Sequence, residues 1–455
     1  MSDFSSVVAQ LSKRFSGRLL MPKDPEWSAA RRVHNGLVDK RPALIAQCLG
    51  SADIASVVRF ARDHGLEIAV RGGGHNVGGR ATVDGGLMID LSLMKHVHVD
   101  PVRRIARAAG GTLWGHFNRE TQAHGLATTG GVISTTGVAG LALGGGVGWL
   151  MPKHGMALDN LRSVDLVLAD GRIVRASVEE HPDLFWALRG GGGNFGVVSS
   201  FEFGLHEVGP TVTGGVIGWS VDGARDVLSH FRNLAAKATD DTMLAAALRT
   251  GPDGATKLAA VAVGFFGRAT EADSALRPIK SFGQPVIDTI GPIPYSDLNT
   301  ILDASFPRGA RNYWKSHFCE QLTDEAIDTI IDRFMQCPSP MGDVLIESFH
   351  GAATRVAPTD TAFALRASGF NVSVLAQWMA PADDGANIVW ARDSYAALQP
   401  FVGARRYVNY LDQDDADAAA LAAAYGPNVQ RLRSIKAKYD PDNMFHLNVN
   451  IPPRA

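Results

Sequence analysis

Three clusters of glycine between residues 71 and 196 restrict how the first half of this chain can fold. They occupy residues 71–79 (RGGGHNVGG), 130–148 and 190–196. Residues 51–200 hold 27 of the 49 glycines, where even spreading would give about 16. Glycine lets consecutive backbone N–H groups point into one concavity without a side chain in the way. Three such loops indicate an extended ligand with a pyrophosphate, such as a dinucleotide; the alternative is that the glycines only form tight turns.

The composition is that of an ordinary globular protein. Its 455 residues are 45% hydrophobic and 20% charged, and this length favours two domains over one. A formal net charge of -2 gives no electrostatic reason to expect nucleic acid or an anionic membrane as a partner. We therefore expect a small-molecule substrate and a monomer or homodimer.

The cysteines and the N-terminal residues indicate a reducing compartment. Cys48, Cys319 and Cys337 are too few and too far apart for a disulfide framework, and no CxxC or HExxH motif indicates a metal site. The N-terminal residues lack a continuous apolar segment with a small-residue cleavage site, so we expect a cytoplasmic protein. The uncharged stretch 125–152 contains nine glycines, which makes it a poor membrane span.

The first part of the chain is predicted to form an α+β domain over residues 1–207, with its core over 37–207. Helical spacing and alternation of apolar residues support it. The predicted elements are a helix over 52–65, a strand over 67–71, small β-hairpins over 83–91 and 105–109, and a hairpin over 164–176 that turns at Asp170 and Gly171.

The rest of the chain is predicted to form a substrate domain over 208–412 and a C-terminal segment over 413–455 that returns to the first domain. The substrate domain is expected to be an antiparallel sheet covered by helices. Its predicted strands and helices, followed by the two helices of the C-terminal segment, are strands 257–266, 343–349 and 371–378, and helices 324–337, 386–398, 416–424 and 428–439.

Several standard catalytic motifs are absent. There is no Walker A loop and no GxSxG sequence. A GxGxxG match at 191–196 follows a helical segment and precedes a strand, which is the reverse of the Rossmann order.

His75 is the leading candidate for a functional residue. It lies at the end of a predicted strand inside RGGGHNVGG. A neutral imidazole nitrogen is nucleophilic, so it can bond to an electrophilic cofactor carbon as well as form hydrogen bonds.

Five segments of the chain together resemble a known family. They are RGGGHNVGG, GGVISTTGVAGLALGGGVGWLMPKHG, DLFWALRGGGGNFGVVSSFEF, YVNYLD and KYDPDNMFHLNVNIPP. In this order they resemble the berberine-bridge-enzyme-like flavoprotein oxidases of the vanillyl-alcohol-oxidase and p-cresol-methylhydroxylase superfamily. The likeness extends from about residue 37 to 453 and is strongest to the bacterial branch, which includes 6-hydroxy-D-nicotine oxidase.

The resemblance implies a p-cresol-methylhydroxylase-type FAD-binding domain and a covalent bond from His75 to the flavin. Many members add a second bond through a cysteine, where this chain has Ile133, so we predict a single link. The residues expected to bind the cofactor are Arg71, Gly72, Gly73, Gly74, His75, Asn76, Gly79, Gly131, Ser134, Thr135, Thr136, Gly137, Gly140, Leu141, Gly144, Gly146, Gly148, Trp149, Gly193, Asn194, Gly196, Val197, Asn409, Asn448 and Asn450.

Tyr410 is the base that the resemblance implies, taking a proton while hydride goes to the flavin. Tyrosine ionises near pH 10, so nearby positive charge would be needed, and Arg405, Arg406 and Lys315 are candidates. The alternative is that Tyr410 only packs on the flavin. Tyr407, three residues earlier, would point to the other face of a regular strand and is a lesser candidate.

The substrate pocket is expected to draw on Trp314, Lys315, Glu347, His350, Gln377 and Tyr407. The leading function is oxidation of a small aromatic, heterocyclic or alkaloid-like alcohol or amine. O2 would be the acceptor and H2O2 the product, because Thr136 has the shape of the valine seen in oxidases of this family. The alternatives are a carbohydrate oxidase acting on an anomeric hydroxyl, and a flavin-binding protein without turnover.

Overall fold

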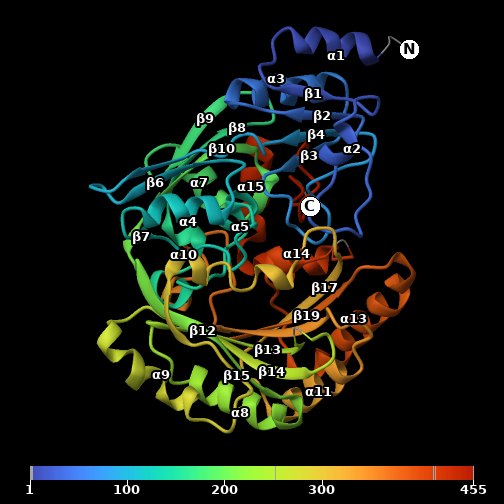
Figure 1. Ribbon diagram of the computed structural model, residues 1–455. Helices are drawn as coiled ribbons and strands as arrows, with labels where there is room; N and C mark the ends of the chain where they lie inside the picture. The colour runs from blue at the N-terminus through green and yellow to red at the C-terminus, as the bar shows by residue number, and fades with distance from the viewer. Residues whose placement is uncertain (1–3, 252, 413, 416, 454–455) are drawn as a thin grey trace.

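The computed structural model describes residues 4–453 except 252, 413 and 416. Its strands form three sheets in the first half of the chain and one large sheet in the second (Figure 1). None of the helices within this described part is long and apolar enough to cross a membrane.

A small sheet, mostly parallel, carries the first glycine cluster at its edge. Its strands, in spatial order, are β1 (Arg18–Leu20), β2 (Leu44–Gln47), β4 (Leu87–Asp90) and β3 (Ile68–Arg71). Apolar residues of α3 (Ser51–Asp63) pack on it. The hairpin predicted over 83–91 is wrong, because β4 is an inner strand that pairs in parallel with β2 and β3. Its run of four buried residues is typical of a parallel strand.

The second sheet of this half is antiparallel, in the order β5 (Val97–Asp100), β6 (Ile105–Ala109), β10 (Val197–Gly204), β8 (Leu161–Val167) and β9 (Ile173–Ser177). The predicted 164–176 hairpin is present as β8 and β9. A third pair joins β7 (Leu126–Ala127) to β11 (His206–Glu207).

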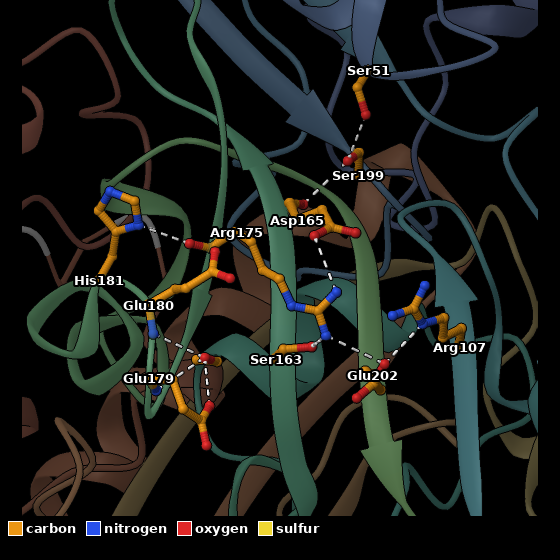
Figure 2. A network of polar contacts seen from close by, with 11 residues as sticks. Ser51, Arg107, Ser163, Asp165, Arg175, Glu179, Glu180, His181, Ser199 and Glu202 are labelled. Atoms are coloured by element: carbon orange, nitrogen blue, oxygen red, sulfur yellow. Dashed lines mark hydrogen bonds and ion pairs between the residues drawn. The ribbon is translucent and has the colours of Figure 1, made fainter.

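A ladder of charged side chains crosses the strands of the five-stranded sheet (Figure 2). Glu202 on β10 accepts a hydrogen bond from Arg107 Nε at 2.7 Å, and Arg175 on β9 donates to Ser163 Oγ at 2.6 Å. Arg175 also reaches Glu202, so the ladder fixes neighbouring strands to one another.

The first half contains further helices, and two short helices, α10 and α12, lie between strands of the second half. They are α1 (Phe4–Ser12), α2 (Trp27–Ala30), α4 (Trp114–Gln122), α5 (Val138–Leu143), α6 (Met151–His154), α7 (Pro182–Leu188), α10 (Tyr295–Leu298) and α12 (Ala352–Arg355).

The second half forms an eight-stranded antiparallel sheet, as the alternation predicts. The spatial order is β15 (Ile287–Asp288), β12 (Thr211–Ser220), β14 (Lys257–Phe265), β13 (Thr242–Thr250), β18 (Asp343–Phe349), β19 (Gly369–Trp378) and β17 (Arg311–Cys319), and β16 (Gly291–Pro294) also pairs with β12.

Helices cover one face of this sheet, and the other face is turned toward the first half of the chain (Figure 1). The covering helices are α8 (Ala224–Ala235), α9 (Ala272–Lys280), α11 (Asp324–Met335) and α13 (Asp384–Leu398). Along β13 the side chains of Leu244, Ala246 and Leu248 enter the core beneath these helices. The intervening residues therefore face the opposite way, as strand geometry requires.

Helices and a turn of the C-terminal segment contact the first half of the chain. These helices are α14 (Ala418–Tyr425) and α15 (Val429–Tyr439), whereas Ala416, the predicted start, lies outside the described residues. The buried Lys436 ammonium donates to the carbonyl oxygens of Asn194 at 2.7 Å and Phe445 at 2.9 Å. Asp440, also buried, accepts from Lys436 and from two backbone N–H groups of the turn that follows.

Candidate active site

A single cavity extends from the glycine loops to the open face of the eight-stranded sheet. It is lined by all three glycine clusters, by strands β12, β13, β14, β17, β18 and β19, and by C-terminal residues 445 and 447–449. Segments far apart in the sequence therefore meet around one space, and the sheet forms its floor.

The glycine loops pack so closely that side chains would not fit between them. A Cβ on Gly73 would lie 2.4 Å from the backbone nitrogen of Gly137, and Gly74 has a φ of +67°, which favours glycine. At Gly140 a Cβ would meet no atom within 4 Å, and this residue lines the cavity. The loops thus bring backbone to the cavity wall and leave space beside it.

His75 lies on the cavity wall just beyond β3, and a second histidine packs flat against it. The His75 and His34 ring centroids are 3.8 Å apart, and His75 Nε2 lies 3.3 Å from Thr135 Oγ1. Burial, and secondarily His34, lowers the pKa of His75 to about 3. The imidazole is therefore neutral at physiological pH and retains a nucleophilic lone pair.

Ile133 also lines the cavity and is 8% exposed. No cysteine is among the described residues that line it, and both Cys48 and Cys319 are buried elsewhere. Ile133 itself carries no thiol that could attach to a cofactor.

Arg71 does not line the cavity; it ends β3, immediately before the first glycine loop, and its side chain fixes the neighbouring segments. Its guanidinium pairs with Asp90 and donates to the carbonyl oxygens of Ala30 and Arg32 at 2.6 and 3.0 Å. Burial opposes ionisation of Asp90, but the charge and hydrogen bonds of Arg71 outweigh it and keep the pKa of that carboxyl below its usual value.

Arg71→Leu is expected to destabilise the protein by about 3–5 kcal/mol, because it leaves the Asp90 carboxylate buried without its partner. Thermal unfolding of the variant, followed by circular dichroism, measures the loss. Arg119→Leu, an exposed change on α4, is the control. An unchanged midpoint for Arg71→Leu would contradict a supporting role for this ion pair.

The other residues expected to bind the cofactor divide into two groups. Those that line the cavity are Gly72, Gly73, Gly74, His75, Asn76, Gly131, Thr136, Gly137, Gly140, Leu141, Gly144, Trp149, Gly193, Gly196, Val197, Asn409 and Asn448. Those outside the lining are Gly79, Ser134, Thr135, Gly146, Gly148, Asn194 and Asn450, of which Ser134 bonds to Asp303 and Asn194 to the backbone of residues 191, 449 and 451.

Tyr410 and Glu347 form a buried pair on the cavity wall. The Tyr410 hydroxyl donates to Glu347 Oε1 at 3.1 Å, and Asn371 Nδ2 donates to Glu347 Oε2 at 3.0 Å. Burial raises the pKa of Glu347 to about 7, against the effect of these two hydrogen bonds. Burial, together with the charge of Glu347, raises the pKa of Tyr410 well above 10.

The expectation that a cation would lower the pKa of Tyr410 is wrong. Arg405 pairs with Glu320, Lys315 pairs with Asp415, and Arg406 donates to Tyr395 and to backbone carbonyls. Each of these long side chains therefore has acceptors other than the Tyr410 hydroxyl. The phenol is next to a carboxylate instead.

Tyr407 lies beside Tyr410, contrary to the prediction that it points to the opposite face. Residues Val408–Tyr410 form a 3-10 turn rather than a strand, which brings the two rings to a centroid distance of 4.8 Å. The Tyr407 hydroxyl accepts hydrogen bonds from Gly146 N and Asn409 Nδ2 at 3.0 and 2.9 Å. It therefore fixes the central glycine cluster.

The predicted substrate residues also divide into two groups. Trp314, Glu347 and Tyr407 line the cavity, and the Trp314 ring meets the Tyr410 ring edge-on. Lys315, His350 and Gln377 do not line it. His350 bonds to Ser348 and to the Thr242 carbonyl, and Gln377 bonds to Asn312, so their hydrogen bonds stay within the substrate domain.

Most of the floor was missed by reasoning from the sequence. Residues at alternate positions of β13 and β14 line the floor. The small apolar residues at alternate positions of these two strands were the sequence signal that could have identified it. The missed lining residues of the floor and its edges are Val216, Met243, Ala245, Ala247, Arg249, Ala260, Ala262, Leu302, Phe306, Asp343, Leu345 and Leu375.

The cavity fits an FAD. Among the described residues, Arg80 Nε and Trp149 Nε1 are buried donors without a hydrogen-bond partner, and both residues line the cavity. A bound anion or flavin edge would satisfy such groups. The residues that would hold the group are those of the glycine loops, with His75 beside them.

The comparisons with known proteins agree with this geometry. Residues 42–177 match the family model for an FAD binding domain, and residues 406–452 match the model named berberine and berberine like. The (R)-6-hydroxynicotine oxidase of Paenarthrobacter nicotinovorans is 34% identical, with 99% of each chain covered. The glucooligosaccharide oxidase of Sarocladium strictum is 31% identical, over 94% of this chain and 91% of its own.

The crystal structure of 6-hydroxy-D-nicotine oxidase from Arthrobacter nicotinovorans superposes with a TM-score of 0.88 at 32% identity, covering 97% of this chain and 98% of that one. Both the cofactor loops and the C-terminal segment are included in these matches. The chain therefore belongs to the berberine-bridge-enzyme-like family of FAD-linked oxidases and is an FAD-dependent oxidoreductase.

Proposed function

We propose that the protein oxidises a small, flat aromatic or heterocyclic alcohol or amine, with O2 as the final electron acceptor and H2O2 as the product. The observation that carries the proposal is the Tyr410–Glu347 pair, which faces an apolar floor inside the cofactor cavity. The FAD supplies the hydride acceptor when it is bound.

The pair gives the substrate proton a defined route. The Tyr410 oxygen accepts the proton of the substrate hydroxyl or amine, while the Tyr410 proton moves to Glu347 Oε1, 3.1 Å away. A free phenolate is disfavoured at this buried position, so the two transfers are coupled. Asn371 holds the other carboxylate oxygen and keeps Glu347 aimed at the phenol.

The composition of the floor supports an aromatic substrate over an oligosaccharide. Next to Glu347, small and apolar side chains from β13 and β14 make a flat surface that offers no hydrogen bonds to sugar hydroxyls; these are Met243, Ala245, Ala247, Ala260 and Ala262. The relatives include both a hydroxynicotine oxidase and a glucooligosaccharide oxidase, so sequence similarity does not distinguish an aromatic substrate from a carbohydrate.

Anaerobic bleaching of the flavin tests the proposal. Benzylic and heterocyclic alcohols and amines are mixed with the holoenzyme, alongside a series of mono- and oligosaccharides. Faster bleaching by the aromatic series, followed by peroxide release when O2 is admitted, is the expected result. Bleaching by sugars alone would make the protein a carbohydrate oxidase, and bleaching by none would favour a flavin carrier.

The rate of flavin reduction is expected to rise with pH and level off above about 7. Glu347 accepts the proton only when ionised, and the ionised fraction falls about tenfold per unit as pH drops below its pKa of about 7. Stopped-flow reduction between about pH 5.5 and 8.5 measures the profile. A rate independent of pH across this range would contradict Glu347 as the acceptor.

We also propose that the FAD is attached through His75 alone. The neutral, cavity-facing imidazole supports the bond, and Ile133 together with the absence of cysteine from the described cavity lining supports the lack of a second one.

A further inference from the structure

The end of the cavity remote from Tyr410 carries two polar side chains in an otherwise apolar surface. Arg249 on β13 and Asp343 on β18 both line the cavity. The strands pair Ala245 with Glu347 and Leu248 with Val344, so one further residue along places Arg249 beside Asp343. The Arg249 Nη2 and Asp343 Oδ2 atoms lie 3.9 Å apart, too far for a hydrogen bond.

These two groups keep hydrogen-bonding capacity that the protein does not use. Within the described part of the chain, the Arg249 side chain donates a hydrogen bond from Nη2 to Ser305 Oγ at 2.9 Å. The Asp343 carboxylate accepts none from the described part of the chain, although the residue is only 8% exposed. A buried carboxylate normally accepts hydrogen bonds, so the open acceptor positions of Asp343 at the cavity wall, beside the partly exposed Arg249, indicate a ligand group.

The position of the pair sets the length of that ligand. Asp343 and Glu347 are four residues apart on β18 and face the same way, which separates them by about 13 Å along the strand. The reacting end of the substrate bonds to Tyr410, whose hydroxyl meets Glu347. Allowing ~3 Å for the hydrogen bond at Asp343 and ~3 Å for the one at Tyr410 leaves about 7 Å, roughly the length of two fused aromatic rings. The alanines of β13 and β14 lie along this distance and provide a flat surface.

We propose that Arg249 and Asp343 bind a neutral polar group of the substrate that presents an acceptor and a donor side by side, such as a carboxamide or lactam. Arg249 donates to the acceptor oxygen and Asp343 accepts from the N–H. The proposal rests on the proposed function, because it takes Tyr410 and Glu347 as the reacting end. It adds the substrate class, which is a flat two-ring body with a polar end opposite the oxidised carbon.

A carboxylate is the competing ligand group at this position, and the neighbouring charges disfavour it. Arg249 alone would attract an anion bidentately. Asp343 lies next to it, however, and a second carboxylate there would repel the first in a site with little water. Burial raises the pKa of Asp343 to about 6, against the charge of Arg249, so this carboxyl is mainly ionised at pH 7.

Binding of three naphthalene probes to the holoenzyme tests the proposal. Naphthalene-2-carboxamide, 2-naphthoate and naphthalene have no alcohol or amine carbon to oxidise, so their dissociation constants are measured by flavin absorbance without turnover. The carboxamide is expected to bind at least tenfold more tightly than either other probe. Arg249→Met and Asp343→Asn should each raise the dissociation constant of the carboxamide by about tenfold or more and leave that of naphthalene within about twofold of the wild-type value.

Arg119→Met, an exposed arginine on α4, is the matched control and should bind all three probes as the wild type does. Equal binding of carboxamide and naphthalene, no binding of any probe, or an equal effect of Arg249→Met on both would overturn the proposal. Tighter binding of 2-naphthoate than of the carboxamide would show that the site prefers an anion to a neutral group, and it would overturn the proposal too. Bleaching by aryl alcohols, measured separately, shows whether the proposed function stands.

Discussion

Glu347→Gln is expected to slow flavin reduction by about 10²–10⁴-fold, because glutamine cannot take the proton that Tyr410 gives up. The change keeps the size of the side chain beside Asn371 and leaves the cofactor loops untouched. Anaerobic stopped-flow reduction with the best substrate from the bleaching series measures the rate. The variant should also lose the dependence on pH, which a merely structural defect would preserve.

Tyr410→Phe is expected to cause a loss of similar size, and the double variant should be hardly slower than either single one. Two groups that act as one unit give such non-additive effects. Glu325→Gln, an exposed change on α11, is the control and should react like the wild type. If Glu347→Gln kept both the rate and the pH profile, the proton acceptor would lie elsewhere.

His75→Ala is expected to abolish covalent attachment of the flavin completely. The wild-type protein should keep its yellow colour after acid precipitation, and the variant should release all of it to the supernatant. Trypsin cleavage after Arg71 and Arg80 isolates His75 in the peptide 72–80, which should carry the entire FAD mass.

His98→Ala, on an exposed position of β5, should remain yellow after the same treatment. FAD mass on any other peptide of the wild type would contradict attachment through His75 alone. A yellow pellet from His75→Ala would identify a different tether. Free FAD titrated into the variant should still bind, because the glycine loops are unchanged.

The cofactor side of the site could be predicted because local rules govern it. The first glycine cluster and the histidine inside it lie within nine residues of sequence, 71–79. The alternation along 343–349 likewise predicted a strand, and β18 occupies that range. Such patterns depend on neighbours along the chain, which the sequence displays directly.

The pairing of Tyr410 with Glu347 could not be predicted in the same way, because its geometry depends on partners far apart in the chain. Tyr410 and Glu347 are 63 residues apart, and nothing local shows that their side chains meet. The 3-10 turn at Val408–Tyr410 also reversed the expected facing of Tyr407. Arg405 was one of three candidates for the positive charge near the phenol, but it pairs with Glu320, because a long cationic side chain has many acceptors within reach.

Because the returning C-terminal segment forms part of the cavity wall, the cavity is complete only after this segment has been synthesised and has folded back. Residues 445 and 447–449 form part of the cavity wall, and Lys436 closes it against the loop that carries Asn194. During synthesis the glycine loops emerge hundreds of residues before this last wall exists, and domains generally fold in the order of translation. A chain that lacks residues 445–449 would have the glycine loops without this part of the wall, so we expect it to hold flavin more weakly.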